Sequence, residues 1–206
     1  MSAPQYRESL RRLTPRVYVG GELIASVADE PRLEPGINAV GLTYDFALLP
    51  AYAKTMVTPG LSGAPTNRFL AINRSRDDLL DKLEAVRLTC QYAGCTQRYL
   101  THDAFNGLWE ATWRIAQRTG GENHERLKAY IAYAQANDLA IGIAMTDGKG
   151  DRSKRPSEQA EPLSYVHVTE RRADGIVIAG VKAIVTGGPY MHEYLVLPCR
   201  RMREED

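Results

Sequence analysis

The stretch Ala144-Met145-Thr146-Asp147-Gly148-Lys149-Gly150-Asp151-Arg152 lies where the hydrophobic pattern of the chain changes. Before it, apolar residues recur at the three- and four-residue spacing of helices, and after it they alternate as in strands. The change predicts a helical N-terminal domain over residues 1–140 and part of an antiparallel β domain over residues 141–206. The predicted fold class is therefore α+β.

The β part is short. Tyr165–Val168 and Ile176–Gly180 flank Ala173-Asp174-Gly175, which is a strong hairpin signal, and Tyr194–Leu197 reads as one more strand. A few strands cannot close on themselves or cover both faces, so we expect an incomplete sheet.

The helical part carries a clear start signal at Ser75, because Asp78 three residues later completes a capping box. Leu79, Leu83, Val86 and Cys90 then recur at helical spacing, which predicts the buried face of that helix. The remaining pattern predicts a hairpin over 17–24 and helices over 5–13, about 39–49, a segment from near Phe105 to Thr119, and about 123–137.

Composition limits the classes of function. Of 206 residues, 44% are hydrophobic and 25% charged, and the net charge of +1 argues against nucleic acid as a partner. The first residues lack the apolar core of a signal peptide, and no apolar run is long enough to span a membrane. Three cysteines suit a reducing cytoplasm, and the four histidines lack the spacing of a metal site. We therefore expect a cytoplasmic protein with no metal ligands.

By spacing alone, the 144–152 stretch is a weak signal. Its backbone N–H groups, Lys149 and Arg152 can hold an anion, and its glycines allow a ligand to approach the backbone closely. The order of Gly and Lys matches neither a P-loop nor a dinucleotide fingerprint, so an ordinary solvated loop is an equally good interpretation.

Several blocks of the chain, in the right order, carry a family resemblance: Tyr6–Arg11, Arg16–Glu22, Thr66–Phe69, Cys95–Tyr99, Asp103–Asn106, Asn137–Leu139, Met145–Arg152, Asp174–Val177 and Thr186-Gly187. Together they resemble the flavoprotein family of the 4-hydroxyphenylacetate 3-hydroxylases and the 4-hydroxybutyryl-CoA dehydratases (vinylacetyl-CoA isomerases). The sequence of these blocks is more similar to the dehydratase branch.

The resemblance implies an acyl-CoA-dehydrogenase-like fold, with a helical domain, a middle β domain and a C-terminal helical bundle. It extends over essentially the whole chain but matches only the first part of that architecture. We therefore expect a segment or split subunit that lacks the bundle. Its expected partners are a helical C-terminal chain or domain and, when the enzyme is complete, further copies in a homo-oligomer.

The resemblance also implies FAD as the cofactor. The matching flavin contacts are Met145, Thr146, Asp147, Lys149, Gly150, Asp151, Arg152 and Thr186. Gly148 stands where relatives often carry proline.

Cys95 and Tyr99 match two cysteines that ligate a [4Fe–4S] cluster in the dehydratases. A phenol is a poor substitute for a thiolate, so we expect this cluster to be lost and Cys95 to be a small buried core residue. If the segment is helical, both side chains share one face. In the hydroxylases, Tyr99 matches a tyrosine near the phenolic substrate, but the accompanying arginine and histidine are replaced by Cys95 and Ile143. Catalysis and simple packing are both open for Tyr99.

Two further positions match the dehydratases. Arg87 corresponds to an arginine on the substrate side, although a one-residue gap makes a surface arginine equally plausible. His192-Glu193 matches a His-Glu pair, and we expect the histidine to lie on a strand and bond to backbone. Arg87 and Tyr99 are the candidate catalytic residues.

Three functions follow from this interpretation. The first is a monooxygenase that uses reduced FAD from a flavin reductase and acts on an aromatic substrate. The second is a CoA-ester dehydratase or isomerase, which the closer wording and the Thr186 and His192 matches support. The third is a scaffold without turnover that binds a partner through its incomplete sheet.

Overall fold

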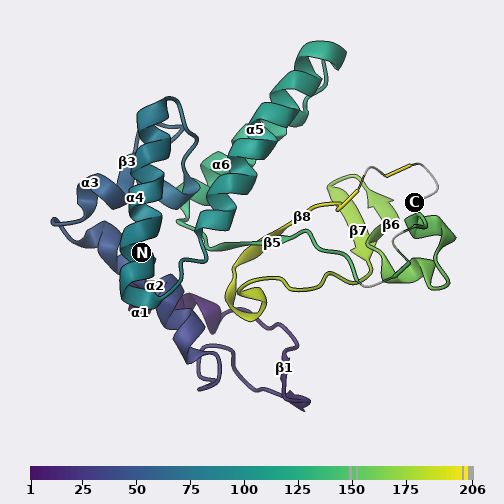
Figure 1. Cartoon of the computed structure of the whole chain (residues 1–206), viewed down its shortest axis with the longest axis horizontal. Coiled ribbons are helices and arrows are strands. Elements are labelled where there is room, and N and C mark those ends of the chain that lie inside the picture. The colour runs from purple at the N-terminus through teal and green to yellow at the C-terminus, as the bar shows by residue number, and fades with distance from the viewer. Residues whose placement is uncertain (149, 152, 201, 204–206) are drawn as a thin grey trace. The chain divides into compact units, whose positions relative to one another are not determined.

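The computed structural model describes residues 1–148, 150–151, 153–200 and 202–203 (Figure 1). The chain forms two compact units. Unit 1 comprises Met1–Gly142 and Gly187–Glu193, and unit 2 comprises Ile143–Thr186 and Tyr194–Asp206. The chain therefore crosses between the units three times. The division into two domains at residue 140 stays a prediction.

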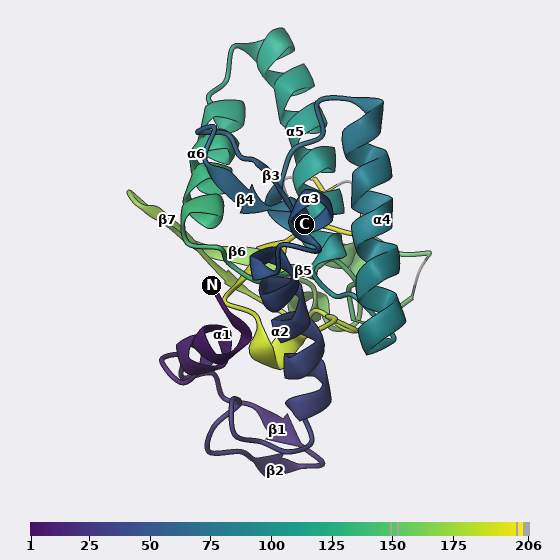
Figure 2. The same cartoon turned by 90° about the vertical axis from the view of Figure 1, so that its left-hand side faces the viewer.

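Unit 1 is mainly helical. Its helices are α1 (Ala3–Leu10), α2 (Glu34–Leu48), α3 (Ala53–Met56), α4 (Arg76–Ala93), α5 (Tyr99–Thr119) and α6 (Asn123–Ala136), and its short hairpins are β1 (Tyr18–Val19) with β2 (Glu22–Leu23) and β3 (Val57–Pro59) with β4 (Pro65–Asn67). Two 3₁₀ turns, η1 (Arg68–Leu70) and η4 (Gly188–Tyr190), complete it. Figure 2 shows α4, α5 and α6 side by side above α1 and α2.

Local sequence signals explain several helix ends. Ser75 and Asp78 form the predicted capping box of α4, and Gly94, in the left-handed region at φ 71°, ends that helix. Gly120 ends α5 in the same way, as predicted. Helix α2 begins at Glu34, five residues before the predicted start, because Pro35 occupies its first turn, where a missing N–H costs nothing.

The predicted buried face of α4 is only half right, because Val86 packs partly buried against the core and Cys90 is half-buried, whereas the two leucines are not buried. Leu79 and Leu83 are exposed, Leu83 by 52%, whereas Lys82, Ala85 and Thr89 are buried. The helix packs against α2 and α3 through Ala85, which joins the cluster of Phe46, Met56 and Phe69. The packed face of α4 therefore runs through Ala85, Val86 and Thr89 rather than through Leu79 and Leu83.

The larger core of unit 1 surrounds Tyr6, Tyr44 and Tyr190. The Tyr6 and Tyr44 rings stack at a centroid distance of 5.1 Å, and the Tyr6 hydroxyl donates to the Tyr190 carbonyl at 2.5 Å. The core cluster contains Tyr6, Leu10, Val27, Ala28, Ile37, Val40, Tyr44, Ala140, Tyr190 and Met191. Segment 187–193 therefore completes the core that the first 142 residues build.

Unit 2 is mainly strand and loop. Strand β5 (Ile141–Ala144), which starts at the end of the first segment of unit 1, pairs with β8 (Glu193–Val196), and β6 (His167–Arg172) pairs antiparallel with β7 (Gly175–Ala179). The register joins Val168 to Ile178 and is interrupted by a bulge between Val168 and Glu170. Two 3₁₀ turns, η2 (Pro156–Glu158) and η3 (Pro162–Ser164), precede the hairpin. The chain thus mixes helix and strand, as predicted.

Within the described residues, no helix is both long and apolar enough to cross a membrane.

Candidate functional site

The loop that follows β5 is held by the segment that follows β7, and both belong to unit 2. The amide of Ala183 donates to the carbonyl of Thr146 at 2.8 Å, and Asp147 forms an antiparallel bridge with Lys182. The two segments are thus paired although they lie more than thirty residues apart in the sequence. The first part of the 145–152 stretch is therefore paired with another segment rather than a free loop. We call the paired segments Met145–Asp147 and Val181–Ala183 the ledge.

Lys182 ties this ledge together. Its ammonium donates to the Asp147 carboxylate at 2.5 Å and to the carbonyls of Met145 and Leu197, each at 2.8 Å. The side chains of Lys182 and Asp147 are only 9% and 13% exposed. Three donated bonds use the whole donor capacity of a lysine. Sequence reasoning missed Lys182, because a single lysine among small apolar residues carries no pattern.

Thr186 lies near this ledge. It follows Ala183 by three residues, which an extended chain covers in about 10 Å. Thr186 lies beyond the hairpin, because β7 ends at Ala179 and Gly180, at φ 126°, turns the chain. Between Gly180 and Thr186, the residue Ile184 is 88% exposed and its backbone adopts the left-handed region at φ 54°. For a β-branched residue that conformation costs on the order of 1–2 kcal/mol.

The hydroxyls of Thr146 and Thr186 are free to meet a ligand. Both residues are exposed, and neither side chain makes a hydrogen bond to another residue that the structure describes. A Cβ built on Gly148 would meet no atom within 4 Å, so the backbone there faces open space. The backbone at Gly148 and the two exposed threonines are accessible to a ligand, and the hydroxyls offer it donors. The exposed residues therefore fit a flavin, whereas the carboxylate of Asp147 is already engaged by Lys182.

The far end of the stretch is organised by Gln159. Its side-chain oxygen accepts from the Asp151 amide at 2.9 Å, and a Cβ on Gly150 would collide with that oxygen at 2.6 Å. The Asp151 carboxylate accepts from the backbone and hydroxyl of Ser153, which holds the pKa of Asp151 below its usual value. The predicted contacts Lys149 and Arg152 lie outside the described residues.

Tyr99 opens α5 and is half-buried. Its ring packs against the cluster of Phe46, Met56, Phe69 and Ala85, with the Lys82 ammonium 5.7 Å from the ring centroid. The prediction that Cys95 is a small buried core residue is wrong, and the condition for a helix face shared with Tyr99 is not met. Cys95 is exposed, and because α5 begins only at Tyr99, the two residues do not share a helix face.

Arg87 lies on the exposed side of α4. Its guanidinium pairs with Glu84 at 2.9 Å, and this pair raises the pKa of Arg87 and lowers that of Glu84. Five residues separate Arg87 from Lys82, the α4 side chain that faces Tyr99, which places the two about 140° apart around the helix. The structure therefore does not bring the two candidate catalytic residues together.

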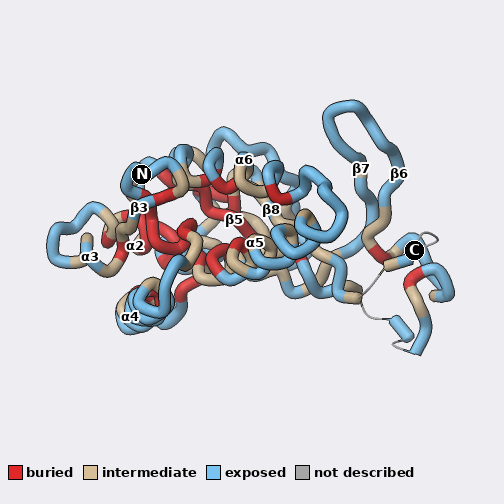
Figure 3. Tube along the Cα trace, turned by 90° about the horizontal axis from the view of Figure 1, so that it is seen from above, coloured by how far each residue is buried: buried red, intermediate tan, exposed pale blue. Residues whose placement is uncertain are grey.

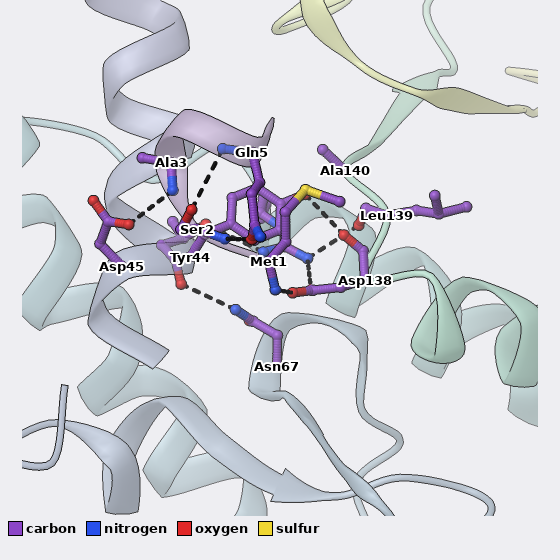
Figure 4. Close-up of polar contacts among 12 residues, drawn as sticks. Met1, Ser2, Ala3, Gln5, Tyr44, Asp45, Asn67, Asp138, Leu139 and Ala140 are labelled. Atoms are coloured by element: carbon purple, nitrogen blue, oxygen red, sulfur yellow. Dashed lines mark hydrogen bonds and ion pairs between the residues drawn. The ribbon is translucent and has the colours of Figure 1, made fainter. Parts of the chain in front are cut away.

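Sequence reasoning did not single out Arg98, which connects three parts of the unit 1 core. It is fully buried, its guanidinium lies 4.1 Å from the Tyr44 ring centroid, and it donates at 3.0 Å to both Asp138 and the Leu139 carbonyl. Figure 4 shows the other side of this network, where the Met1 amino group meets Asp138 at 3.1 Å. The only sequence signal for this arginine was its place in one of the blocks of resemblance.

His192 bonds to backbone, as predicted, although it precedes β8 instead of lying on it. The Ala140 amide donates to its Nδ1 at 2.9 Å, so the neutral ring carries its proton on Nε2, which donates to Ser9 at 2.7 Å. Burial, reinforced by the charge of Arg98, lowers the pKa of His192 to about 4. This histidine is a fixed part of the unit 1 core.

Of the Cys95–Tyr99 pair, only Cys95 offers a thiolate, and a phenol is a poor ligand for an iron–sulfur cluster. Among the described residues, no three His, Cys, Asp or Glu side chains gather where they could hold a metal ion. Cys95 stands with a tyrosine at the position of the second cysteine. We derive no chemistry through such a cluster.

The family model described as "4-hydroxyphenylacetate 3-hydroxylase N terminal" matches residues 2–206. The chain belongs to the 4-hydroxyphenylacetate 3-hydroxylase family. The predicted resemblance is confirmed.

Members of this family on both branches are similar to the chain. It is 43% identical over 208 residues to the 4-hydroxybutyryl-CoA dehydratase/vinylacetyl-CoA-Delta-isomerase of Clostridium aminobutyricum, covering all of this chain and 42% of that protein. An oxygen-tolerant archaeal 4-hydroxybutyryl-CoA dehydratase from N. maritimus superposes with a TM-score of 0.93 at 37% identity, covering 100% of this chain and 41% of that one.

The oxygenase branch shares the fold. The oxygenase component of 4-hydroxyphenylacetate 3-monooxygenase, solved in complex with FAD, superposes with a TM-score of 0.78 at 24% identity, covering 96% of this chain and 41% of that one. The chain thus spans about two fifths of the length of these relatives.

Proposed function

We propose that this chain forms the flavin-side N-terminal part of an FAD-dependent enzyme. The observation that carries the proposal is the ledge of unit 2, where Met145–Asp147 pairs with Val181–Ala183 and leaves the hydroxyls of Thr146 and Thr186 exposed. The family includes an oxygenase solved with FAD, which supports the choice of cofactor. The remaining contacts would come from the longer part of the enzyme that the relatives possess.

In this proposal the chain binds and orients the cofactor. Thr146 and Thr186 would donate hydrogen bonds to it, and Gly148 would let it approach the backbone. Gly150 stays a candidate contact, although its Cα faces Gln159. Lys182 and Asp147 hold the ledge in place. Lys149 and Arg152 lie outside the described residues and stay candidate contacts for the phosphates, because their charges suit an anion. Bound FAD would supply the redox chemistry, and the protein would tune it through donors near the ring.

Our first candidate reaction is a monooxygenation with reduced FAD, delivered by a flavin reductase, on an aromatic substrate. Tyr99 supports it, because a tyrosine replaces the second cluster cysteine and its phenol can bond to a phenolic substrate. Arg87, on the exposed side of α4, would act only if another chain covers it.

The second candidate is a CoA-ester dehydratase or isomerase, and overall similarity favours it. The dehydratases match the full length of this chain at 43% and 37% identity, and one superposes with a TM-score of 0.93. Such an enzyme would have to work with Tyr99 in place of a cysteine.

The rest of the proposed assembly follows the family. We propose an acyl-CoA-dehydrogenase-like enzyme of the cytoplasm, completed by a C-terminal helical bundle and assembled as a homo-oligomer. A scaffold without turnover is the third possibility, and it would bind the same partner without FAD.

Metal analysis and an absorbance spectrum of the purified assembly distinguish these candidates. Flavin bands without iron support the monooxygenase. A stoichiometric iron–sulfur signal beside flavin would favour the dehydratase, and an assembly with neither would favour the scaffold.

A further inference from the structure

Ile184 of unit 2 combines an exposed apolar side chain with a strained backbone. Its side chain is more exposed, at 88%, than any other large apolar side chain in the part of the chain that the structure describes. Its backbone lies in the left-handed region, at φ 54°, which glycine and asparagine tolerate and a β-branched residue avoids. An isoleucine at this position therefore stabilises the fold neither by burial nor through its backbone.

Exposure alone does not mark a site in unit 2. Strands β6 and β7 are almost wholly exposed as well (Figure 3). Their isoleucines, Ile176 and Ile178, lie in a paired strand, where β-branched residues are favoured. Ile184 lies beyond β7 and has no such reason to be there. Strained residues of this kind concentrate at ligand sites.

Ile184 directly follows the paired part of the ledge. The bridge between Asp147 and Lys182 continues to Ala183, whose amide donates to the Thr146 carbonyl at 2.8 Å. In a regular strand Ile184 would share a face with Lys182, whose side chain is only 9% exposed. The left-handed backbone interrupts this alternation, and the side chain of Ile184 is exposed instead.

The neighbours of Ile184 on the ledge are polar. Thr186, two residues later, is exposed, and so is Thr146, and the backbone at Gly148 faces open space. Ile184 thus adds one large apolar side chain to a surface that otherwise offers hydroxyl groups and accessible backbone.

We propose that Ile184 is a ligand-contacting residue whose side chain packs against the ring system of the flavin. This assignment rests on the proposed function. The isoalloxazine ring is planar, with a polar edge that needs hydrogen-bond donors and an apolar part that needs a nonpolar neighbour. The hydroxyls of Thr146 and Thr186 suit the polar edge, and Ile184 suits the apolar part. An apolar protein surface would use only Ile184, whereas the ring uses all three side chains.

The test separates the ring from the rest of the cofactor. Residues 1–206 are titrated with FMN, which carries the ring without the adenine half, and with AMP, which is the adenine half without the ring. Amide chemical shifts report the binding. Ile184→Asn tolerates the left-handed region but removes the apolar surface. It should weaken FMN binding about three- to tenfold, as expected for an apolar side chain that a ligand covers in part, and leave AMP binding unchanged.

Three further variants exclude a merely structural effect. Ile184→Gly also tolerates the left-handed region and should act like I184N. In both variants the Ala183 amide should exchange hydrogen no faster than in the unaltered chain, because the backbone strain is relieved. Ile184→Val keeps a β-branched apolar side chain and should retain FMN affinity within about twofold. The matched control is Ile176→Asn, which changes an exposed isoleucine of β7 and should alter neither titration.

FMN binding that I184N and I184G leave unchanged would overturn the inference, and so would equal weakening of FMN and AMP. In both cases the proposed function stands, because the unaltered chain still binds flavin at the ledge. FMN shifts in the unaltered chain that bypass Met145–Asp147 and Thr186 would instead contradict the proposed function, and the assignment of Ile184 with it.

Discussion

The Lys182 ammonium donates to the Asp147 carboxylate at 2.5 Å, and both side chains are almost buried within unit 2. This pair connects the loop after β5 with the segment after β7, and the same ammonium also holds the carbonyls of Met145 and Leu197. The position of the proposed flavin ledge therefore depends on a residue 35 positions further along the chain.

Replacing Lys182 with Met should release the ledge. The variant leaves the Asp147 carboxylate without its partner in a poorly solvated place, which costs on the order of 3 kcal/mol. We expect faster amide exchange at Thr146, Asp147 and Ala183 by NMR. The double variant D147N/K182M removes the stranded charge and should recover part of the loss. An unchanged exchange rate in K182M would show that the pair does not hold the ledge.

Arg98→Lys should destabilise unit 1 although it keeps the charge. A lysine cannot stack on Tyr44 and donate to both Asp138 and the Leu139 carbonyl, so buried acceptors lose their donors. The free energy of unfolding in urea should fall by roughly 2–4 kcal/mol. Arg87→Lys, on the exposed side of α4, is the matched control and should leave the midpoint unchanged. Equal effects of the two changes would contradict the structural role of Arg98.

Acid should destabilise unit 1 through two buried histidines. Burial lowers the pKa of both His102 and His192 to about 4, below the value of about 6.5 in an unfolded chain. Between pH 4 and pH 6.5 these histidines bind protons in the unfolded state but not in the folded state. The free energy of unfolding is therefore at its full value above about pH 6.5 and falls as the pH approaches 4. Each histidine should lower the free energy of unfolding by roughly 1–3 kcal/mol over this pH range.

Urea unfolding at a series of pH values measures this effect, and His192→Gln should flatten the curve by about half. The glutamine oxygen can still accept from the Ala140 amide, so the backbone bond has a replacement. Stability that stays level between pH 6.5 and 4.5 would contradict the neutral state of these rings.

Helix α4 offers a test of which face carries its stability. Leu83→Ala removes an exposed side chain and should change the free energy of unfolding by less than about 0.5 kcal/mol. Ala85→Leu inserts a larger side chain against Phe46 and Met56 and should cost about 1–3 kcal/mol. The reverse order, measured by urea unfolding, would restore the face that the periodicity predicted.

That helix also shows how far the sequence can be interpreted. Ser75 and Asp78 predicted where α4 starts, because a capping box depends only on residues three apart. Leu79 and Leu83 were wrongly expected to be buried, because periodicity locates apolar side chains but does not reveal which of them a neighbour covers. Ala85 is buried and Leu83 exposed for a reason that lies in α2 and α3.

In the candidate site, too, local features were predicted from the sequence and contacts between distant residues were not. The family and the position of the 145–152 stretch followed from blocks of sequence, and the hairpin followed from alternation around Ala173-Asp174-Gly175. Lys182 and Arg98 were missed because their partners are distant in the chain. Cys95 was expected in the core, but α5 begins four residues later and leaves it on an exposed turn.

The central claim is that the ledge and Thr186 together form one side of a flavin site. Amide chemical-shift mapping of this chain with millimolar FAD tests it most directly. The account predicts weak binding, with shifts concentrated at Met145–Gly148, Gly150–Asp151 and Thr186, and weakened by the double variant T146V/T186V. Shifts confined to other parts of the chain, or binding that T146V/T186V leaves unchanged, would contradict it.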